Sequence, residues 1–370
     1  MTTPERLAIY CGPMDGNSTA RIAVRLANGF VAAGTPTDLL TTGIAHLAAE
    51  SLDPAVTRVE LGRQRVGLPL VRLVLYLRRH RPTAILTHRI RENGLTQRAV
   101  RLSGLPIPVF ATVHGPLSFK LAHLEAARRR KRTAQVERWY RRNRALIAIS
   151  EETAADLRTL LGTSVPIETI PNPIVTSDLE ERAAGPVGHP WFADPSGPVL
   201  VFAGRFVREK DLTTLLRAVA LVRAKQDCRL LMIGEGPLRA DLEAERARLG
   251  LADQVAMPGF MTNPYPYLRA ADLVVLSSVW DALPTVLIEA MALGTPVVST
   301  DCGAGPREIL DHGRLGPLVA PGDAHALAAA IAATLAAPPD PRRLREGAAR
   351  YDAARNAERY RRLLLSLDPA

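Results

Sequence analysis

The stretch DLVVLSSVWDALPTVLIEAMALGTPVVST, residues 272–300, indicates the fold class because it contains a strand, a helix and a second strand in succession. The helix is expected to begin near Pro284, since proline is favoured at the first helical position. It is expected to end at Gly294, since glycine is favoured just past the last turn. Apolar strands that alternate with helices in this way predict a parallel sheet covered by helices.

The same alternation runs through the chain twice, with a break between the two series. The strand-like segments of the first series are LAIYCG (7–12), TDLLTT (37–42), TAILTH (83–88), PVFATVHG (108–115) and ALIAIS (145–150). The break, residues 171–198, contains six prolines and three glycines, which is typical of a linker. A second series starts at PVLVFAG. We therefore predict an α/β protein with two Rossmann-like domains that face each other across a cleft, at the carboxyl ends of their strands.

The predicted domains are residues 1–175 and 176–344. The terminal segment, from about residue 345 to 370, reads as an arginine-rich amphipathic helix. We expect this helix to cross back to the first domain.

Composition indicates an ordinary globular protein, with 47% apolar and 23% charged residues. The three cysteines, Cys11, Cys228 and Cys302, form no CxxC pair and no cluster with histidine, so neither a disulfide framework nor a zinc site is expected. The alanine-rich tract at residues 326–337 is shorter than the roughly 20 residues that cross a bilayer, and LAIYCG follows too early for a signal peptide. We expect a cytoplasmic protein that binds no metal.

The net charge of +10 lies in the first half of the chain. Residues 1–175 hold 25 Lys and Arg against 13 Asp and Glu, a balance of +12, whereas residues 176–370 hold 22 against 24, a balance of −2. The densest basic run, between His123 and Arg144, has nine basic residues, two acids and the dipeptide Trp139–Tyr140. Three interpretations stay open for this run: contact with an anionic membrane surface, contact with nucleic acid, or a solvated helix face.

Two carboxylates interrupt the apolar run of the opening stretch. Asp281 falls in the loop after the first strand, and Glu289 falls in the middle of the helix, where only Thr285 adds to a polar stripe. One interpretation is a solvated helix face. The other is a ligand site, because ligands of open parallel sheets bind at the carboxyl ends of the strands. A carboxylate there accepts hydrogen bonds from the vicinal hydroxyls of a sugar.

A pair of cations follows another strand. In GRFVREKDL, residues 204–212, Arg205 and Lys210 lie in a loop that leads from a strand into a helix. Two fixed cations there could hold a diphosphate and stabilise it as a leaving group without a metal. The glycine-rich loops DCGAGPREIL and CGPMDGNSTA, the second with Gly16, could offer backbone N–H groups to phosphate oxygens. His114 also ends a strand and is a further candidate.

Cofactor fingerprints are absent from the sequence. GEGPLR, residues 234–239, resembles GxGxxG but ends in Arg239 and lies in the second series. The first strand–helix turn lacks the dinucleotide pattern, and no Walker sequence occurs. No bound cofactor is expected.

Together these segments resemble one family, the retaining glycosyltransferases of family four, which have the GT-B fold. FAGRFVREKDLTTLLRAV, MIGEGPLRADLE, ADLVVLSS and DALPTVLIEAMALGTPVVSTDCGAGPREIL occur in the family's order and spacing. TVHGP, IAISEETAADL and IPNPIV are concordant echoes in the first domain. The resemblance covers nearly the full chain. It implies transfer of a sugar from a nucleotide-diphosphate donor, with retention of configuration and without a metal.

The resemblance also implies roles for individual positions. Arg205 and Lys210 would bind the donor diphosphate, Glu289 would hold the ribose hydroxyls, and Asp281 would contact the donor sugar. His114 would lie beside the transferring sugar. The remaining donor contacts implied by the family are Gly16, which would approach the diphosphate through its backbone, and Gly204, Leu283, Pro284 and Thr285.

This chain departs from the family at one point that concerns the sugar. Asp281 and Ala282 stand where family members usually have glutamate and glycine, and the shorter acid draws the carboxylate back by about one C–C bond. The form of the motif around them is more similar to transferases that use UDP-linked sugars. With the basic run, the resemblance suggests a lipid-linked or cell-envelope glycan as acceptor and peripheral contact with the inner face of the plasma membrane.

Other functions stay open. A GT-B nucleotide-sugar epimerase is one, and a glycogen-phosphorylase-like enzyme is another, although the short, lysine-poor chain argues against a pyridoxal cofactor. A basic nucleic-acid-binding protein is the non-enzymatic alternative, but the sequence shows no recognition motif for nucleic acid.

Overall fold

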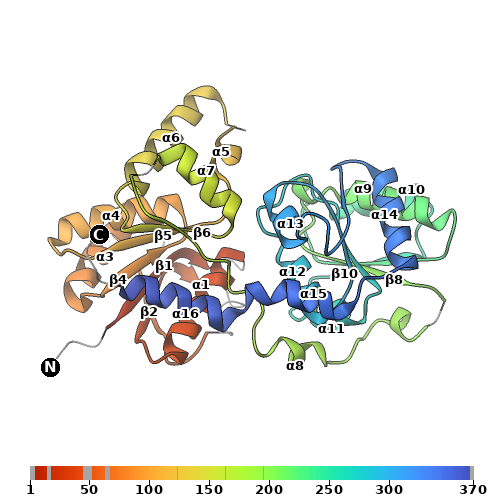
Figure 1. Ribbon diagram of the computed structural model, residues 1–370, viewed down its shortest axis with the longest axis horizontal. Helices are drawn as coiled ribbons and strands as arrows, with labels where there is room; N and C mark the ends of the chain where they lie inside the picture. The colour runs from red at the N-terminus through yellow and green to blue at the C-terminus, as the bar shows by residue number, and fades with distance from the viewer. Residues whose placement is uncertain are drawn as a thin grey trace. The chain divides into compact units, whose positions relative to one another are not determined.

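The computed structural model describes residues 5–14, 18–44, 52–62, 67–122, 124–162, 164–194 and 196–366. It divides into two compact units, residues 1–173 with 353–370, and residues 174–352. The sequence places these divisions near residues 175 and 345. Each unit is a parallel sheet covered by helices, so the predicted pair of Rossmann-like domains is confirmed (Figure 1). The predicted cleft between them stays a prediction.

The first unit is built on seven parallel strands in the order β3-β2-β1-β4-β5-β6-β7. The strands are β1 (Leu7–Met14), β2 (Thr37–Ile44), β3 (Thr57–Glu60), β4 (Ala84–Thr87), β5 (Val109–Val113), β6 (Ala145–Ala148) and β7 (Ile167–Thr169). The order reverses between β1 and β4, because the chain first moves outward to β2 and β3 and later outward on the other side. Such a junction is where open parallel sheets bind ligands.

Helices cover both faces of this sheet. They are α1 (Ser18–Ala32), α3 (Leu68–His80), α4 (Ile90–Ser103), α5 (Leu117–Ala122), α6 (Ala126–Tyr140), α7 (Glu151–Leu161) and α16 (Ala353–Leu365). The core on one face joins the strands to α3, α4, α5, α6 and α7. On the other face α16 packs against α1 and β4, with Asn356 and Tyr360 fully buried (Figure 1). The predicted return of the C-terminal helix to the first domain is confirmed.

The second unit is built on six parallel strands in the order β10-β9-β8-β11-β12-β13. The strands are β8 (Val199–Ala203), β9 (Arg229–Ile233), β10 (Val255–Gly259), β11 (Leu273–Leu276), β12 (Val297–Thr300) and β13 (Leu318–Val319). The order reverses between β8 and β11, which makes their carboxyl ends the switch point of this sheet.

The helices of the second unit also lie in two layers. They are α8 (Leu179–Ala183), α9 (Leu212–Arg223), α10 (Arg239–Arg248), α11 (Tyr265–Ala270), α12 (Thr285–Leu293), α13 (Ala304–Ile309), α14 (Ala324–Ala336) and α15 (Pro341–Ala348), with 3-10 turns η1 (Pro190–Phe192), η2 (Arg208–Lys210) and η3 (Ala349–Tyr351). Contacts join α9 to α10 and α14 in one layer, and α12 to α11 and α15 in the other. The predicted limits of α12 are confirmed, since Pro284 precedes it and Gly294 ends it with a φ of 82°. No helix among the residues described is long and apolar enough to span a bilayer.

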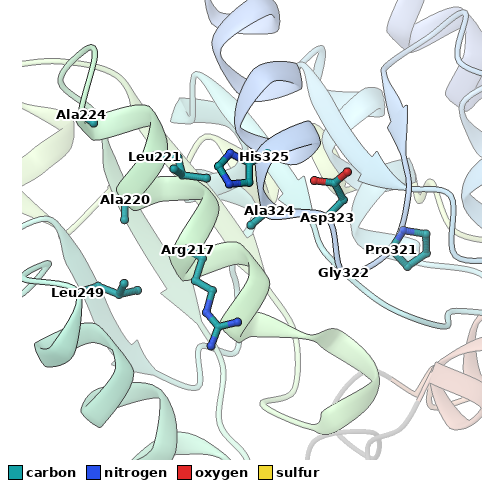
Figure 2. A pocket seen from close by; sticks show the side chains of 10 residues that line it. All are labelled: Arg217, Ala220, Leu221, Ala224, Leu249, Pro321, Gly322, Asp323, Ala324 and His325. Carbon is teal, nitrogen blue, oxygen red and sulfur yellow. The ribbon is translucent and has the colours of Figure 1, made fainter.

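A shallow depression of about 720 Å³ lies on the outer layer, between α9, the end of α10 and the start of α14 (Figure 2). Its charged groups already have partners within the fold. Arg217 pairs with Glu245 at 3.0 Å, and Asp323 accepts a hydrogen bond from the N–H of Ala326 at 2.9 Å. The depression contains none of the site residues predicted from the sequence.

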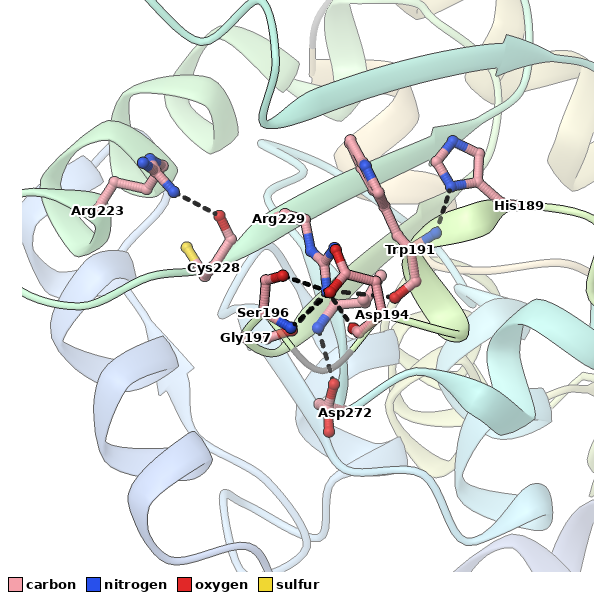
Figure 3. A network of polar contacts seen from close by, with 10 residues as sticks. His189, Trp191, Asp194, Ser196, Gly197, Arg223, Cys228, Arg229 and Asp272 are labelled. Carbon is pink, nitrogen blue, oxygen red and sulfur yellow. Dashed lines mark hydrogen bonds and ion pairs between the residues drawn. The ribbon is translucent and has the colours of Figure 1, made fainter.

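The segment predicted as a linker is largely part of the second unit, where one buried arginine holds it (Figure 3). Arg229, at the start of β9, donates to a carboxylate oxygen of Asp194 at 2.8 Å and to the carbonyls of Trp191, Asp194 and Gly197 at 3.2, 2.9 and 2.9 Å. Its guanidinium also lies over the Trp191 ring. Hydrogen bonds from a charged donor stabilise more than neutral ones, so Arg229 replaces the regular structure that the proline-rich segment cannot form.

Replacing Arg229 with methionine should lower the free energy of unfolding of the second unit by about 3 kcal/mol, because three carbonyls and a carboxylate lose a charged donor. Arg223→Met is the control: its side chain is 27% exposed, its partner Asp227 is 75% exposed, and its bond to the carbonyl of Cys228 is long at 3.3 Å, so about 1 kcal/mol or less is expected. Urea unfolding, with hydrogen exchange of residues 189–197, measures both. Equal losses in the two variants would contradict the role of Arg229.

Candidate active site

Loops after neighbouring strands meet at the carboxyl edge of the second sheet, and two of them are locked together by their main chains. The N–H of Gly204, after β8, donates to the carbonyl of Ile233 at 2.9 Å, and the N–H of Phe206 donates to that of Glu235 at 2.8 Å. Gly234, after β9, has a φ of +146°, and a Cβ there would collide with the carbonyl oxygen of Gly204. GEGPLR, which lacks a cofactor role on sequence grounds, therefore fixes the loop that carries Arg205 and Lys210.

The loops after β8 and β11 are joined across the switch point. Lys210 forms an ion pair with Asp281, and its carbonyl accepts a hydrogen bond from the Ser277 hydroxyl at 2.8 Å. The Val279 N–H donates to the carbonyl of Glu209 at 2.9 Å. The side chains of Lys210 and Asp281 are 20% and 16% exposed, so each keeps a face open to solvent. The structure thus brings together one predicted diphosphate-binding cation and the acid predicted to contact the sugar.

The second predicted cation has a different environment. Arg205 is exposed, and within the described part of the chain its guanidinium has neither an ion-pair nor a hydrogen-bond partner. Lys210 is the last residue of η2, and the chain turns directly after it at Asp211, whose φ is 43°. Lys210 is therefore neutralised by Asp281, whereas Arg205 presents its full charge.

Glu289 is buried within α12. It is 4% exposed, and its Oε1 accepts a hydrogen bond from the Tyr265 hydroxyl of α11 at 3.3 Å. The guanidinium of Arg182 covers the Tyr265 ring at 4.5 Å from its centroid. The interpretation of Glu289 as part of a solvated helix face is therefore wrong. The positions just before it in the motif are Leu283 and Thr285, which are partly buried, and Pro284, which is buried.

The glycine-rich loop after β12 lies against the loop that carries Asp281. The main chain at Gly305 is in such close contact with Ala282 and Leu283 that a side chain would not fit between them. Asp301 is held by two hydrogen bonds from Arg307, at 3.1 and 2.6 Å. This loop, predicted to meet phosphate, is thus adjacent to the Lys210–Asp281 pair.

In the first unit, two histidines end neighbouring strands. His88, after β4, is 3% exposed, and its Nδ1 lies 3.1 Å from Nε2 of His114, after β5. The two rings stack with their centroids 5.3 Å apart. Burial, with a smaller effect of the Arg89 charge, lowers the pKa of His88 to about 3, so His88 is neutral near pH 7. His88 was missed on sequence grounds, although TAILTH and ATVH both end apolar runs with histidine.

Gly16 lies outside the described residues. The aromatic pair of the basic run does not face a membrane, because Trp139 and Tyr140 are 7% and 2% exposed. Trp139 lies against Gly94 of α4, and the guanidiniums of Arg98, Arg138 and Arg142 lie over its ring. Trp139 thus packs α6 against α4, and Tyr140 packs into the core with strand residues, so their assignment as interfacial residues is wrong.

Across the ranges that the structure describes, no three histidine, cysteine, aspartate or glutamate side chains gather in a group that could hold a metal ion.

Comparison with known families assigns both units. The family model "Glycosyltransferase Family 4" matches residues 19–178, and the model "Glycosyl transferases group 1" matches residues 197–337. The chain belongs to the family 4, group 1 glycosyltransferases. The resemblance seen in the motifs is thereby confirmed.

Individual relatives agree with this assignment. The chain is 35% identical over 176 residues to 2-deoxystreptamine glucosyltransferase of Streptomyces kanamyceticus, covering 45% of this chain and 46% of that protein. It is 34% identical over 194 residues to the lipopolysaccharide core biosynthesis glycosyltransferase LpsD of Rhizobium meliloti, covering 52% and 54%. Both matches span about half the relative's length. The fold is similar to that of sucrose-phosphate synthase from Thermosynechococcus elongatus, with a TM-score of 0.76 and 24% identity over 97% of this chain and 98% of that one.

Gly234→Ala should lower the free energy of unfolding of the second unit by more than a side chain at a positive φ costs by itself. The reason is that the new methyl group collides with the carbonyl of Gly204. Gly250→Ala is the matched control, since Gly250 has a φ of +69° and open space around it. The control should lose about 1–2 kcal/mol of unfolding free energy, and Gly234→Ala about 1–3 kcal/mol more. Urea unfolding compares the two, and equal losses would show that the contact between the loops is not tight.

Proposed function

We propose that this chain is a retaining glycosyltransferase that moves a sugar from a nucleotide-diphosphate donor to an acceptor hydroxyl. The observation that carries the proposal is the Lys210–Asp281 pair at the switch point of the second sheet, beside the exposed Arg205. A diphosphate is anionic and needs cations, whereas sugar hydroxyls donate hydrogen bonds and suit a carboxylate. Lys210 is thus complementary to the diphosphate of such a donor, and Asp281 is complementary to its sugar.

In the proposed reaction the acceptor oxygen bonds to the anomeric carbon on the face from which the diphosphate departs. The bond between that carbon and the diphosphate oxygen breaks, and its electron pair stays on the phosphate. The acceptor's proton passes to the departing phosphate, and Arg205 and Lys210 stabilise the charge that develops there. This route uses neither an enzymic nucleophile nor a metal, so a trapped covalent glycosyl–enzyme adduct would contradict it.

The other donor contacts follow from the family. We propose that Glu289 binds the ribose, that His114 lies beside the transferring sugar, and that the backbone at Gly16 and Gly204 approaches the diphosphate. The start of α12, residues 283–285, completes the donor site. We favour a UDP-linked hexose or N-acetylhexosamine as donor on the form of the motif that contains Asp281.

A lipid-linked or cell-envelope glycan is the acceptor that we favour. The relative named for lipopolysaccharide core biosynthesis supports this class. The relative named for 2-deoxystreptamine points to a small soluble acceptor as the second candidate. The basic first unit supports the first class, because a positive surface suits an acceptor held at an anionic membrane.

Thermal-shift screening against UDP, GDP, ADP and their glucose conjugates tests the proposed donor. One diphosphate nucleotide should raise the melting temperature, since a ligand that binds only the folded state stabilises it. Lys210→Ala should remove most of that shift and lower kcat/KM for transfer by about 100- to 1,000-fold. Lys225→Ala, an exposed lysine of the same unit, should change neither. If no nucleotide stabilises the wild type, the transferase proposal fails.

The surface that would meet a membrane is larger than the basic run alone. Arg128, Arg129, Arg130, Lys131 and Arg132 are exposed on α6, which supplies charge but no exposed aromatic side chain. Three exposed apolar side chains lie on one face of α3, where Leu68, Val71 and Leu75 are 41%, 57% and 59% exposed, and Phe119 of α5 is 42% exposed. Arg78 of α3 donates to the carbonyl of Leu102 at 3.0 Å, and Leu102 is itself 56% exposed. Since α3 carries no acid, this apolar face with arginines around it fits an anionic lipid surface.

Co-sedimentation with phosphatidylcholine vesicles, with and without about 30% phosphatidylglycerol, tests this membrane contact. Glutamine at the five basic positions of α6 should abolish the salt-sensitive part of binding, at about 1 kcal/mol per charge. Serine at Val71 and Leu75 should weaken binding about tenfold or more at high salt, because apolar burial is not screened. Phe260→Ser, a 60% exposed aromatic of the second unit, is the control. Indifference of the wild type to lipid charge would remove the proposal.

A further inference from the structure

A buried glutamate lies at the switch point of the first sheet. Glu92 is in the first turn of α4, just after β4, and is 4% exposed. Strands β1 and β4 are paired as far as Tyr10 and Thr87, so Gly12 lies just beyond the last pair, where the strands separate. Gly12 has a φ of +76°, and a Cβ there would collide with Oε1 of Glu92. The carboxyl group therefore lies directly over the main chain at the edge where open parallel sheets bind ligands.

One oxygen of this carboxyl group has no hydrogen-bond partner among the described residues. Within the described chain nothing bonds to its buried Oε2, and no ion pair reaches it. Burial raises the pKa of Glu92, and a backbone hydrogen bond and the charges of Arg89 and Arg91 only partly offset that effect. After burial, Glu92 is also the largest cause that raises the pKa of Tyr10 on β1 and of Tyr140 on α6. An unpaired buried carboxyl group destabilises the free protein, so the fold alone gives no reason for it.

The next residue, Asn93, is a buried polar side chain with a structural role. Asn93 is fully buried, and its Nδ2 donates to the Thr87 hydroxyl at 3.0 Å and to Oδ1 of Asn143 at 2.7 Å. The N-cap residue of α4, Arg89, makes no side-chain cap, and the Glu92 carboxyl group has a backbone hydrogen bond at its own position that leaves Oε2 without a partner. The two adjacent residues therefore differ in kind: Asn93 holds the fold together, and Glu92 has an unused hydrogen-bonding group at the sheet edge.

We propose that Glu92 binds the acceptor, and that its carboxyl group forms a hydrogen bond with a saccharide hydroxyl at the carboxyl ends of β1 and β4. This inference rests on the proposed function. The His88–His114 pair, at the ends of β4 and β5, is the second polar group along the same edge, and Nε2 of His88 is buried without a partner. A neutral hydroxyl suits the site better than an ammonium group, because residues 1–175 carry 25 basic against 13 acidic side chains.

The stability of the free full-length protein gives the first test. Glu92→Leu should raise the melting temperature of the first unit by about 2–4 °C at pH 7.5, because an unpaired polar group is removed. Glu92→Gln should also stabilise at pH 7.5. A carboxyl group with a raised pKa costs stability only above its unfolded value near 4.5, so this gain should vanish as the pH falls to that value. Destabilisation by both variants at pH 7.5 would mean that the carboxyl group serves the fold, and would overturn the proposal.

Binding of simple saccharides gives the second test. Saturation-transfer NMR is run on the full chain with methyl α-glucoside, methyl α-galactoside, methyl α-mannoside and glycerol. At least one probe should receive saturation from the wild type and from Glu60→Gln, an exposed control at the end of β3. The signal should fall to the protein-free level in Glu92→Leu. Unchanged transfer in Glu92→Leu, or no transfer from the wild type to any probe, overturns the assignment.

The two proposals fail in different ways. Glu92 is not among the proposed contacts of the nucleotide, so Glu92→Leu should keep the full nucleotide shift of the wild type. Loss of the nucleotide shift in the wild type is a failure of the proposed transferase. A normal nucleotide shift with saccharide binding that ignores Glu92 is a failure of this inference alone.

Discussion

The second unit depends on the close approach of main chains at the carboxyl edge of its sheet. Gly234 leaves no space between itself and the carbonyl of Gly204, and two hydrogen bonds hold the loops after β8 and β9 in that position. The loop after β8 then reaches the loop after β11 through Lys210 and Asp281. Each contact limits where the next loop can lie. A site made of loops is as rigid as a site on helices when the backbones themselves are in contact, and this one needs few side-chain contacts to be ordered.

Buried polar groups in this protein are of two kinds, and the difference is physical. Arg229 has four carbonyl or carboxylate partners and carries the proline-rich segment that no helix or strand could hold. Asn93 has two partners and joins β4 to the segment after α6. Glu92 is similarly buried, and its Oε2 has no partner among the described residues. The partners of Arg229 explain its burial by the fold itself, whereas the unsatisfied carboxyl oxygen of Glu92, at the ligand-binding edge of its sheet, is the basis of the binding proposal.

The fold was predictable from the sequence because strand–helix alternation and helix-ending glycines are local signals. The motif around Asp281 was the strongest of these signals in the second unit. Residue environments were less predictable. Trp139 lies in a run so basic that the sequence suggests a surface, yet it is buried, because exposure depends on which face of α6 meets the sheet. For the same reason, the sequence left two interpretations of Glu289 open, a solvated helix face and a ligand site. His88 and Glu92 were missed since no local pattern shows that a polar residue after β4 will be covered by β1 and β5.

The Lys210–Asp281 ion pair sets a condition on how the proposed donor binds. A lysine that is already paired brings little net charge to an approaching diphosphate, so long-range attraction comes first from Arg205, which is exposed and unpaired within the described chain. The ammonium group of Lys210 has three donors, so it can bind a phosphate oxygen without releasing Asp281. Asp281 is then held beside the leaving group by the cation that stabilises it. An aspartate held there ends about one C–C bond short of the family's glutamate. In the proposed complex, position 281 would therefore couple the charge of the leaving-group site to the contact with the donor sugar.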